Sequence, residues 1–278
     1  MVLEKKKLWL YIGVSVGIAA ILLTGILLLF LLPPKPQPEL ATTAATLPPP
    51  LGNVFTPMDF AYDGPYLTCL SAESVLGIDV STHQKEIDWQ QVRQAGITFV
   101  MIRAGYRGSE QGRLFADEWA QRNYEGAKAA GLQVGAYFFS QAISPEEAVE
   151  EAHYAMQIIE SWQLDMPLVY DWEYISEDSR TAQVDARLLT DCTKAFCDTV
   201  TQAGYETMVY FNPTQSRKQM YLEELTDYGF WLAMYSEEMT YEYKVDMWQY
   251  TCQGAVPGIE GPVDINLYFP YEQETQAE

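Results

Sequence analysis

The sequence predicts an α/β fold, an irregular β/α barrel of eight strands, preceded by an N-terminal transmembrane helix. Three observations support this prediction. From about Val75 onward, short apolar segments alternate with segments of helical periodicity, which is typical of parallel β/α units. Acidic and aromatic residues stand where the predicted strands end, the place at which such barrels bind ligands. The uncharged apolar run of residues 8–32 is long enough to span a bilayer.

The first 74 residues are predicted to anchor and space the folded part of the chain. Lys5, Lys6 and Lys7 precede the apolar run, so the positive-inside rule places residues 1–7 in the cytoplasm. Pro33 and Pro34 follow the run directly, without a small-residue cleavage pattern. We therefore expect residues 8–32 to be an uncleaved signal anchor in the cell membrane, with the rest of the chain extracellular. Residues 33–74 are predicted as a stalk rich in Pro, Ala and Thr, followed by an irregular lead-in.

Charge and cysteine content exclude several classes of function. The formal net charge of −21 argues against nucleic acid as a partner, and residues 271–278 form an acidic tail. With only two histidines and no ligand spacing, the sequence predicts no metal site and no cofactor. Cys69 lies just before the first barrel strand and Cys252 just after a late one. Because neighbouring ends of a closed barrel can meet, we hypothesise a disulfide between them.

The barrel domain is predicted over residues 75–270, with five β/α units followed by three strands with little helix between them. Helices are expected after each of the first five strands, the third beginning at the capping residue Ser144 with Pro145 and Glu147. The helical segments are 88–95, 115–130, 144–159, 189–200 and a short one within 213–227. The strands are 76–80, 98–103, 134–139, 167–173, 208–211, 230–235, 247–251 and 263–269.

The strand of residues 167–173 carries two carboxyl groups at its far end. Side chains alternate along a strand, so Val169, Asp171 and Glu173 share one face. The backbones of the two acids are separated by about 6.6 Å along the strand. Two acids in apolar surroundings disfavour each other's ionisation. Such a pair suits glycoside hydrolysis, which needs one protonated carboxyl as general acid and one carboxylate beside the developing positive charge.

Other strand ends add acids, one base and aromatic rings to this pair. In a closed barrel these ends meet, and aromatic side chains there are suited to stacking on sugar rings. The candidate site residues are Asp79, Arg103, Tyr137, Phe139, Asp171, Glu173, Tyr235, Trp248, Gln249 and Asp264.

A series of short motifs resembles the lysozymes of glycoside hydrolase family 25, over about residues 75–270 and in the family's order and spacing. In chain order they are Gly77-Ile78-Asp79-Val80-Ser81, Gln84, Ile87-Asp88-Trp89, Ile102-Arg103-Ala104-Gly105-Tyr106, Gly135-Ala136-Tyr137-Phe138-Phe139-Ser140, Asp171-Trp172-Glu173, Trp231-Leu232-Ala233-Met234-Tyr235, Trp248-Gln249-Tyr250 and Val263-Asp264-Ile265-Asn266.

The resemblance implies a flattened barrel and an N-acetylmuramidase. Its substrate would be the glycan strands of peptidoglycan, cut at the β-1,4 bond between N-acetylmuramic acid and N-acetylglucosamine. Glu173 matches the family's general acid. Asp171 matches the residue that assists the substrate's acetamido group or, in an inverting scheme, orients water. Asp79 and Asp264 match the other two active-site acids. One departure is Lys85, where the family usually has glycine.

Two alternatives to an active muramidase remain. Family 18 chitinases share the barrel and the chemistry but carry an Asp two residues before their Asp-x-Glu, where this chain has Val169. The second alternative is a catalytically silent, membrane-tethered module that only binds peptidoglycan. All four acids are present, which argues against loss of activity, and turbidity loss of purified cell walls separates the two. The backbone spacing leaves the stereochemical outcome open between retention and inversion.

Overall fold

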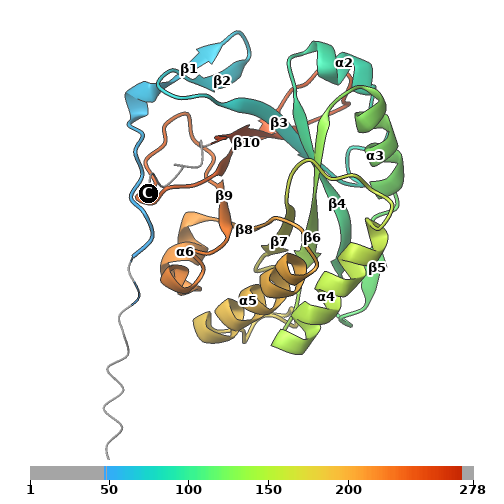
Figure 1. The fold of residues 1–278 in the computed structure, drawn as a ribbon, viewed down its shortest axis with the longest axis vertical. Helices are drawn as coiled ribbons and strands as arrows, with labels where there is room; N and C mark the ends of the chain where they lie inside the picture. The colour runs from blue at the N-terminus through green and yellow to red at the C-terminus, as the bar shows by residue number, and fades with distance from the viewer. Residues whose placement is uncertain (1–46, 48, 271–278) are drawn as a thin grey trace, which may run out of the picture. The chain divides into compact units, whose positions relative to one another are not determined.

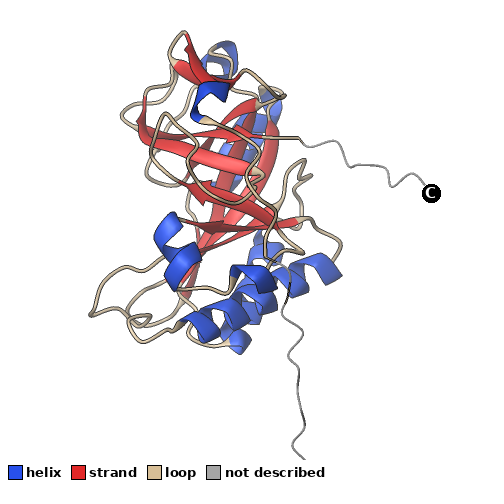
Figure 2. Cartoon of the chain, turned by 90° about the vertical axis from the view of Figure 1, so that its left-hand side faces the viewer, coloured by secondary structure: helices blue, strands red, loops and turns tan. Residues whose placement is uncertain are grey.

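In the computed structural model, which describes residue 47 and residues 49–270, eight strands close into a barrel (Figure 1, Figure 2). Seven of these strands are parallel, and the last is antiparallel to both of its neighbours. Pairing of the first strand with both the second and the last closes the barrel. In order around the barrel, the strands are β3 (Val75–Val80), β4 (Phe99–Arg107), β6 (Gln133–Ser140), β7 (Leu168–Trp172), β8 (Thr207–Phe211), β9 (Gly229–Ala233), β10 (Met247–Gly254) and β11 (Val263–Tyr268).

Helices follow the first five barrel strands and lie outside them (Figure 1). Asp88, Ser144, Asp185 and Asn212 begin four of them by accepting hydrogen bonds from backbone N–H groups of the first turn. The predicted α/β barrel of eight strands, with helices after the first five, is therefore confirmed within the described residues. The helices are α2 (Trp89–Gln94), α3 (Ala120–Ala129), α4 (Pro145–Ile158), α5 (Ala186–Gln202) and α6 (Pro213–Lys218), with a short 3₁₀ turn at Leu222–Glu224.

Side-chain alternation divides each strand between an inner and an outer core. The inner core is a buried cluster that includes Phe99, Met101, Val169, Trp231 and Met247. It fills the barrel below the level of the acidic side chains. Glycines make room for its larger members. A Cβ at Gly77 would lie 2.3 Å from the ring of Phe99, so only glycine fits there. The outer core lies between the strands and the elements that cover them.

The lead-in of the barrel is ordered and covers strands that no helix covers. A 3₁₀ turn (Pro57–Asp59) leads into an antiparallel hairpin of β1 (Phe60–Asp63) and β2 (Tyr66–Cys69). The ring of Phe60 meets Trp248 of β10 edge-on, with 5.1 Å between the ring centres. Phe55 lies against Phe269, just past β11, at 4.8 Å. The lead-in was predicted to be irregular. It forms a hairpin instead, because it provides the apolar cover that helices supply elsewhere.

The helix predicted over residues 115–130 is wrong in its first turn. β4 continues to Arg107 and pairs with a short antiparallel strand, β5 (Leu114–Ala116), so Phe115 lies on a strand. α3 begins only at Ala120. Asp117 fixes the turn between them, since its carboxylate accepts hydrogen bonds from the Trp119 N–H and the Arg103 Nε–H, both at 2.8 Å.

The disulfide predicted between Cys69 and Cys252 is also wrong, because all four cysteines at positions 69, 192, 197 and 252 are free thiols in the structure. The two thiols face different neighbours: the Cys69 Sγ lies 3.7 Å from the Ser71 Oγ, and the Cys252 Sγ accepts from the Gln253 side chain at 3.7 Å. Cys192 and Cys197 are buried on α5.

Among residues 47 and 49–270, no helix has both the length and the apolar character needed to cross a membrane. The span predicted at residues 8–32 lies outside the described residues, as do residues 1–7, residues 33–46 of the stalk and the tail of residues 271–278.

Candidate active site

A cleft of about 400 Å³ opens where the parallel strands end. Nine of the ten predicted site residues line it, so the expected convergence of strand ends occurs. The lining side chains come from every strand of the barrel and from the segments that follow β3, β7 and β9. They are Asp79, Val80, Ser81, His83, Gln84, Arg103, Tyr137, Phe139, Asp171, Glu173, Tyr210, Trp231, Tyr235, Gln249 and Asp264.

Four of these residues carry carboxyl groups, and the barrel places them by strand register. Asp171 lies on the inner face of β7, and Glu173 follows just past the end of that strand. Asp79 is directly opposite Asp264 in the pairing of β3 with β11. Since β11 is antiparallel, its first residues lie at the end where the other strands finish. This reversal brings Asp264 to the cleft from the start of a strand.

Amide side chains hold Asp79 in a fixed orientation. Its Oδ2 accepts hydrogen bonds from the Gln249 Nε2 and the Asn266 Nδ2, each at 2.8 Å. The Asn266 Oδ1 in turn accepts from the Trp231 Nε1 at 2.8 Å. Burial, followed by the charge of Asp264, raises the pKa of Asp79 well above its usual range despite these two donors.

Two tyrosines orient the other end of the same glutamine. The Gln249 Oε1 accepts from the Tyr210 hydroxyl at 2.9 Å and from the Tyr235 hydroxyl at 3.2 Å. Because its oxygen faces the tyrosines, its Nε2 must face Asp79. Tyr235 is otherwise open to solvent, with 58% of its surface exposed, so it forms a rim of the cleft.

Asp171, on β7, is the most enclosed of the four acids. It is 4% exposed, and its buried Oδ1 has no hydrogen-bond partner among the described residues. Burial, then the neighbouring charges of Glu173 and Asp79, raise the pKa of Asp171 well above its usual range, while Arg103 lowers it. A buried acceptor without a donor costs free energy, so this oxygen is suited to receive a donor from a ligand.

Glu173 and Asp264 lie nearer the open side of the cleft. Burial, followed by the charge of Asp264, raises the pKa of Glu173. Burial also raises the pKa of Asp264, to about 6. The four carboxyl groups therefore hold protons to higher pH than isolated carboxyls do, and they titrate as one interacting group. This arrangement can keep one acid protonated beside others that are ionised.

Two buried glutamines hold the backbone at the end of β7. The Gln215 Nε2 donates to the Trp172 carbonyl at 2.7 Å, and the Gln141 Nε2 donates to the Glu173 carbonyl at 2.8 Å. Gln141 is itself fixed by the Thr181 hydroxyl, which donates to its Oε1 at 3.2 Å. Glu173 lies beyond the strand ladder, so these side chains replace the missing β-sheet partners and position its carboxyl group.

Arg103 is the one basic residue of the predicted set, and it forms an ion pair with another side chain of the barrel domain. Its Nη2 lies 2.8 Å from the Oδ2 of Asp117, a carboxyl that is fully buried. Its guanidinium carbon also lies 5.2 Å from the centre of the Tyr106 ring. Arg103 still lines the cleft, where its positive charge partly offsets that of the acids.

Trp248 does not lie in the cleft, and its predicted role in substrate binding is wrong. It is fully buried on the outer side of β10, where its Nε1 donates to the Met234 carbonyl at 2.8 Å and its ring packs on Phe60. The reason is strand alternation: Met247 and Gln249 point into the barrel, so the residue between them points out.

The same alternation identifies residues that the sequence prediction missed. Tyr210 and Trp231 line the cleft from β8 and β9, and Asn266, two residues after Asp264, shares its face of β11. The loop after β3 contributes Ser81, His83 and Gln84 to the lining. Strand alternation from a known inward residue is enough to predict Tyr210, Trp231 and Asn266. No sequence signal marks which loop side chains point into the cleft.

Lys85 occupies a backbone conformation that normally favours glycine. It is the one non-glycine residue of the described chain with positive φ, at +55°. The loop beside the cleft therefore keeps the left-handed turn expected of the family's glycine and adds an exposed, cationic side chain next to Gln84.

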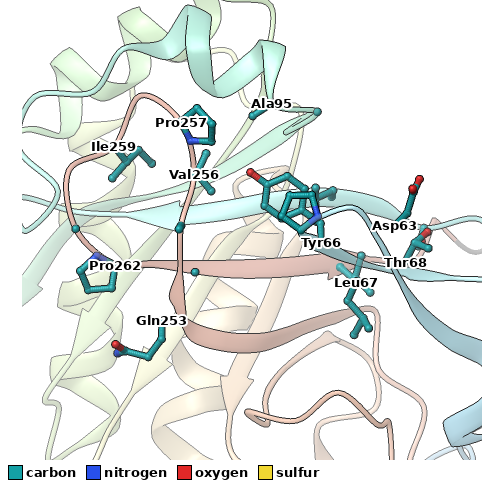
Figure 3. A pocket seen from close by; sticks show the side chains of 18 residues that line it. Asp63, Tyr66, Leu67, Thr68, Ala95, Gln253, Val256, Pro257, Ile259 and Pro262 are labelled. Atoms are coloured by element: carbon teal, nitrogen blue, oxygen red, sulfur yellow. The ribbon is translucent and has the colours of Figure 1, made fainter.

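A larger cavity, of about 1020 Å³, lies outside the barrel, between the lead-in hairpin, α2 and the loop that joins β10 to β11 (Figure 3). Its lining is mostly apolar and small, including Val256, Pro257 and Pro262, and Asp63 is its one charged residue. With a single carboxyl group, this cavity lacks the paired acids of the smaller cleft. The chemistry of the chain is therefore assigned to the smaller one.

A parallel barrel with paired acids at the ends of its strands is the arrangement of a glycoside hydrolase. Comparison with known sequences agrees. The family described as Glycosyl hydrolases family 25 matches residues 78–259. The chain belongs to this family and is a glycoside hydrolase of the lysozyme class.

Individual relatives show moderate sequence identity. The uncharacterized protein YegX of Escherichia coli (strain K12) is 26% identical over 211 residues, which is 73% of each chain. The autolytic lysozyme of Clostridium acetobutylicum is 26% identical over 193 residues, 69% of this chain and 55% of that one. The solved modular autolysin LytC from Streptococcus pneumoniae superposes with a TM-score of 0.63 and 26% identity. That match covers 71% of this chain and 47% of LytC, so this chain spans about half the length of LytC.

Replacing Gln141 with methionine tests whether the glutamines position Glu173. Gln141→Met keeps the side-chain length but removes the donor to the Glu173 carbonyl, so the acid loses a fixed orientation. We expect kcat for glycoside hydrolysis to fall about tenfold with KM within about twofold, because misplacement affects the reacting geometry more than binding. Steady-state kinetics and thermal melting measure both.

Thr181→Val is the matched control, because it removes a hydrogen bond to Gln141 but leaves the bond from Gln141 to Glu173. Equal losses of kcat in the two variants, or no loss in Gln141→Met, would contradict a positioning role for Gln141.

Proposed function

We propose that the chain is an N-acetylmuramidase that hydrolyses the β-1,4 bond between N-acetylmuramic acid and N-acetylglucosamine in peptidoglycan. Two relatives support this substrate. The similar protein of Clostridium acetobutylicum is an autolytic lysozyme, and LytC was solved in complex with a synthetic peptidoglycan ligand. The observation that carries the proposal is the group of four carboxyls lining one cleft, in which the pKa of Glu173 is raised by burial and by the charge of Asp264.

In this proposal Glu173 is the general acid. Burial and the charge of Asp264 raise its pKa, so the carboxyl keeps its proton to higher pH than an isolated glutamic acid does. It donates that proton to the oxygen of the glycosidic bond as the bond breaks. Positive charge then develops at the sugar carbon that loses the oxygen. Asp79 and Asp264, also at the cleft, provide negative charge that stabilises it.

Asp171 is proposed to assist the substrate's own acetamido group. Its unpaired Oδ1 can accept a hydrogen bond from the acetamido N–H, which orients the amide oxygen toward the sugar carbon. Attack by that oxygen forms a cyclic intermediate, and water then opens it after giving a proton to Glu173. In the inverting alternative, the same oxygen would orient the attacking water instead. Either role requires an acceptor without a partner inside the protein.

The Glu173→Gln variant tests the assignment of the general acid. Glutamine keeps the shape of the side chain but has no proton to deliver, so we expect muramidase activity to fall about 10²-fold or more. Stability should be retained, because the change removes one of several mutually repelling acids. The wall-lysis rate and the melting temperature are measured together.

Glu177→Gln, an exposed glutamate four residues further along the same loop, is the control and should lyse walls like the wild type. Near-normal lysis by a folded Glu173→Gln protein would show that another group supplies the proton.

The charge of Asp264 should set the alkaline limit of activity. Its carboxylate raises the pKa of Glu173, so removing it in Asp264→Asn should lower that pKa. The acid would then lose its proton at lower pH, and the alkaline limb of kcat/KM should move to lower pH. A pH profile of residual activity measures this, and a limb that stays or moves upward contradicts the coupling.

Stability gives a second readout for the same variant. The pKa of the folded Asp264 is about 6, against an ordinary value of 3.8, so its ionisation destabilises the fold as pH rises between these values. The melting temperature of Asp264→Asn, measured relative to that of the wild type, should therefore rise as the pH increases from about 4 to about 6.

We further propose that the enzyme is anchored in the cell membrane by residues 8–32, with residues 1–7 cytoplasmic and the barrel facing the wall. The support is the lysine cluster before the uncharged apolar run. A cell-wall substrate lies outside the membrane, so the barrel must lie on that side as well. Protease added to intact protoplasts should digest the barrel and leave a fragment the size of the anchor, whereas a barrel protected until the membrane is opened would overturn this orientation.

A further inference from the structure

The cleft-facing surface of the sheet continues past the carboxyl groups onto the β4–β5 hairpin. Strand register places Asp171 beside Phe139, Phe139 beside Tyr106, and Tyr106 opposite Phe115. Residues at matching positions of paired strands lie on the same face of a sheet. Because Asp171 and Phe139 both line the cleft, Tyr106 and Phe115 lie on the face that the cleft opens on. We call Phe139, Tyr106 and Phe115 the aromatic row.

At the outer end of the aromatic row, two rings stack on each other. The rings of Tyr106 and Phe115 are stacked, with centres 5.2 Å apart and planes at 23°. The guanidinium of Arg103, which lines the cleft, lies 5.2 Å from the centre of the Tyr106 ring. The Arg103 guanidinium, the Tyr106 ring and the Phe115 ring therefore follow one another from the cleft to the outermost strand of the sheet.

Phe115 at the end of the row is open to solvent, with 42% of its surface exposed. Beside it is a hollow of about 280 Å³, lined by residues 108–111, Arg113 and Phe115. Adjacent strands are about 4.8 Å apart, so three strand spacings separate the backbone of Phe115 from that of Asp171 by roughly 14 Å. This distance places Phe115 beyond the bond that is cleaved, where additional sugar units of a long chain would lie.

Buried contacts fix the β4–β5 hairpin against the rest of the barrel domain. Arg107, at the end of β4, is 4% exposed and donates to the Gly112 carbonyl and to the Glu151 carboxylate of α4, both at 2.7 Å. At the base of the hairpin, Arg103 pairs with buried Asp117. An exposed aromatic on a mobile loop would lose entropy on binding, whereas one fixed in this way is already in place.

We propose that the aromatic row is a further saccharide-binding subsite, over which the glycan strand of the substrate extends from the cleft across β4 onto β5. This inference rests on the proposed function, since it requires a polymeric sugar substrate in the cleft. The apolar C–H faces of sugar rings stack on aromatic rings, as the row offers them. An isolated exposed Phe needs no explanation, but one in register with the acids and stacked on Tyr106 does.

Substrate length separates this subsite from the cleft. The substrates are long glycan strands freed of peptide, and the nitrophenyl glycoside of the disaccharide N-acetylglucosaminyl-N-acetylmuramic acid, which occupies the cleft alone. In Phe115→Ala we expect the preference for the long substrate, as the ratio of kcat/KM values, to fall about fivefold to tenfold, because stacked apolar area is lost. Phe115→Trp, which keeps a ring, should retain the preference. An unchanged ratio in Phe115→Ala would overturn the proposal.

Tyr221→Ala is the matched control, because Tyr221 is equally exposed, at 41%, but stacks on Arg187 in another part of the barrel. Its preference for the long substrate should equal that of the wild type, and a loss as large as that of Phe115→Ala would show that exposed aromatics act nonspecifically.

A binding measurement keeps this proposal separate from the proposed function. Co-sedimentation with insoluble glycan is compared for Glu173→Gln and for Glu173→Gln combined with Phe115→Ala, so no turnover is needed. We expect about fivefold to tenfold weaker binding in the double variant, and equal binding would overturn the subsite. If the wild type cleaves neither substrate, the proposed function fails, while this comparison still decides whether the row binds glycan.

Discussion

The central constraint on this site is a group of four carboxyl groups that line one cleft at one end of a closed barrel, two of them buried. Each is desolvated, and each makes ionisation of the others less favourable, so their pKa values rise. Such a group costs stability, which proteins tolerate where function requires it. The amide donors on Asp79, the guanidinium of Arg103 and the glutamines behind β7 partly offset that cost. They also fix where each acid points.

The barrel builds this group by alternation and by one reversal of direction. Inward residues near the starts of the strands, such as Phe99 and Val169, form an apolar floor, and inward residues near the ends carry the acids and their partners. The antiparallel β11 brings Asp264 opposite Asp79, which a uniformly parallel barrel would not do. The lead-in hairpin replaces the helices missing over β10, because Phe60 covers Trp248 there. The irregular part of the barrel is therefore also the part that completes the acidic group.

Much of the fold and of the site could be predicted from the sequence, and the errors have physical causes. Helix periodicity, capping at Ser144 and alternation around Asp171 are local signals. They predict the barrel and its strand ends, and nine of the ten predicted site residues line the cleft. Trp248 has an aromatic ring of the kind that binds sugars, but its position between the inward residues Met247 and Gln249 turns that ring away from the cleft. The hairpin containing Phe115 was not predicted because β5 has only three residues, too few to show strand alternation, and the short segment reads equally well as the start of a helix.

The central claim is that this cleft cuts the bond on the reducing side of N-acetylmuramic acid. Mass spectrometry of the fragments released from purified peptidoglycan, after borohydride reduction of the new chain ends, tests it most directly. Reduced N-acetylmuramic acid is expected at the new ends, with release abolished in the Glu173→Gln protein. Reduced N-acetylglucosamine at those ends, or fragments produced by cleavage of the stem peptides, would contradict it.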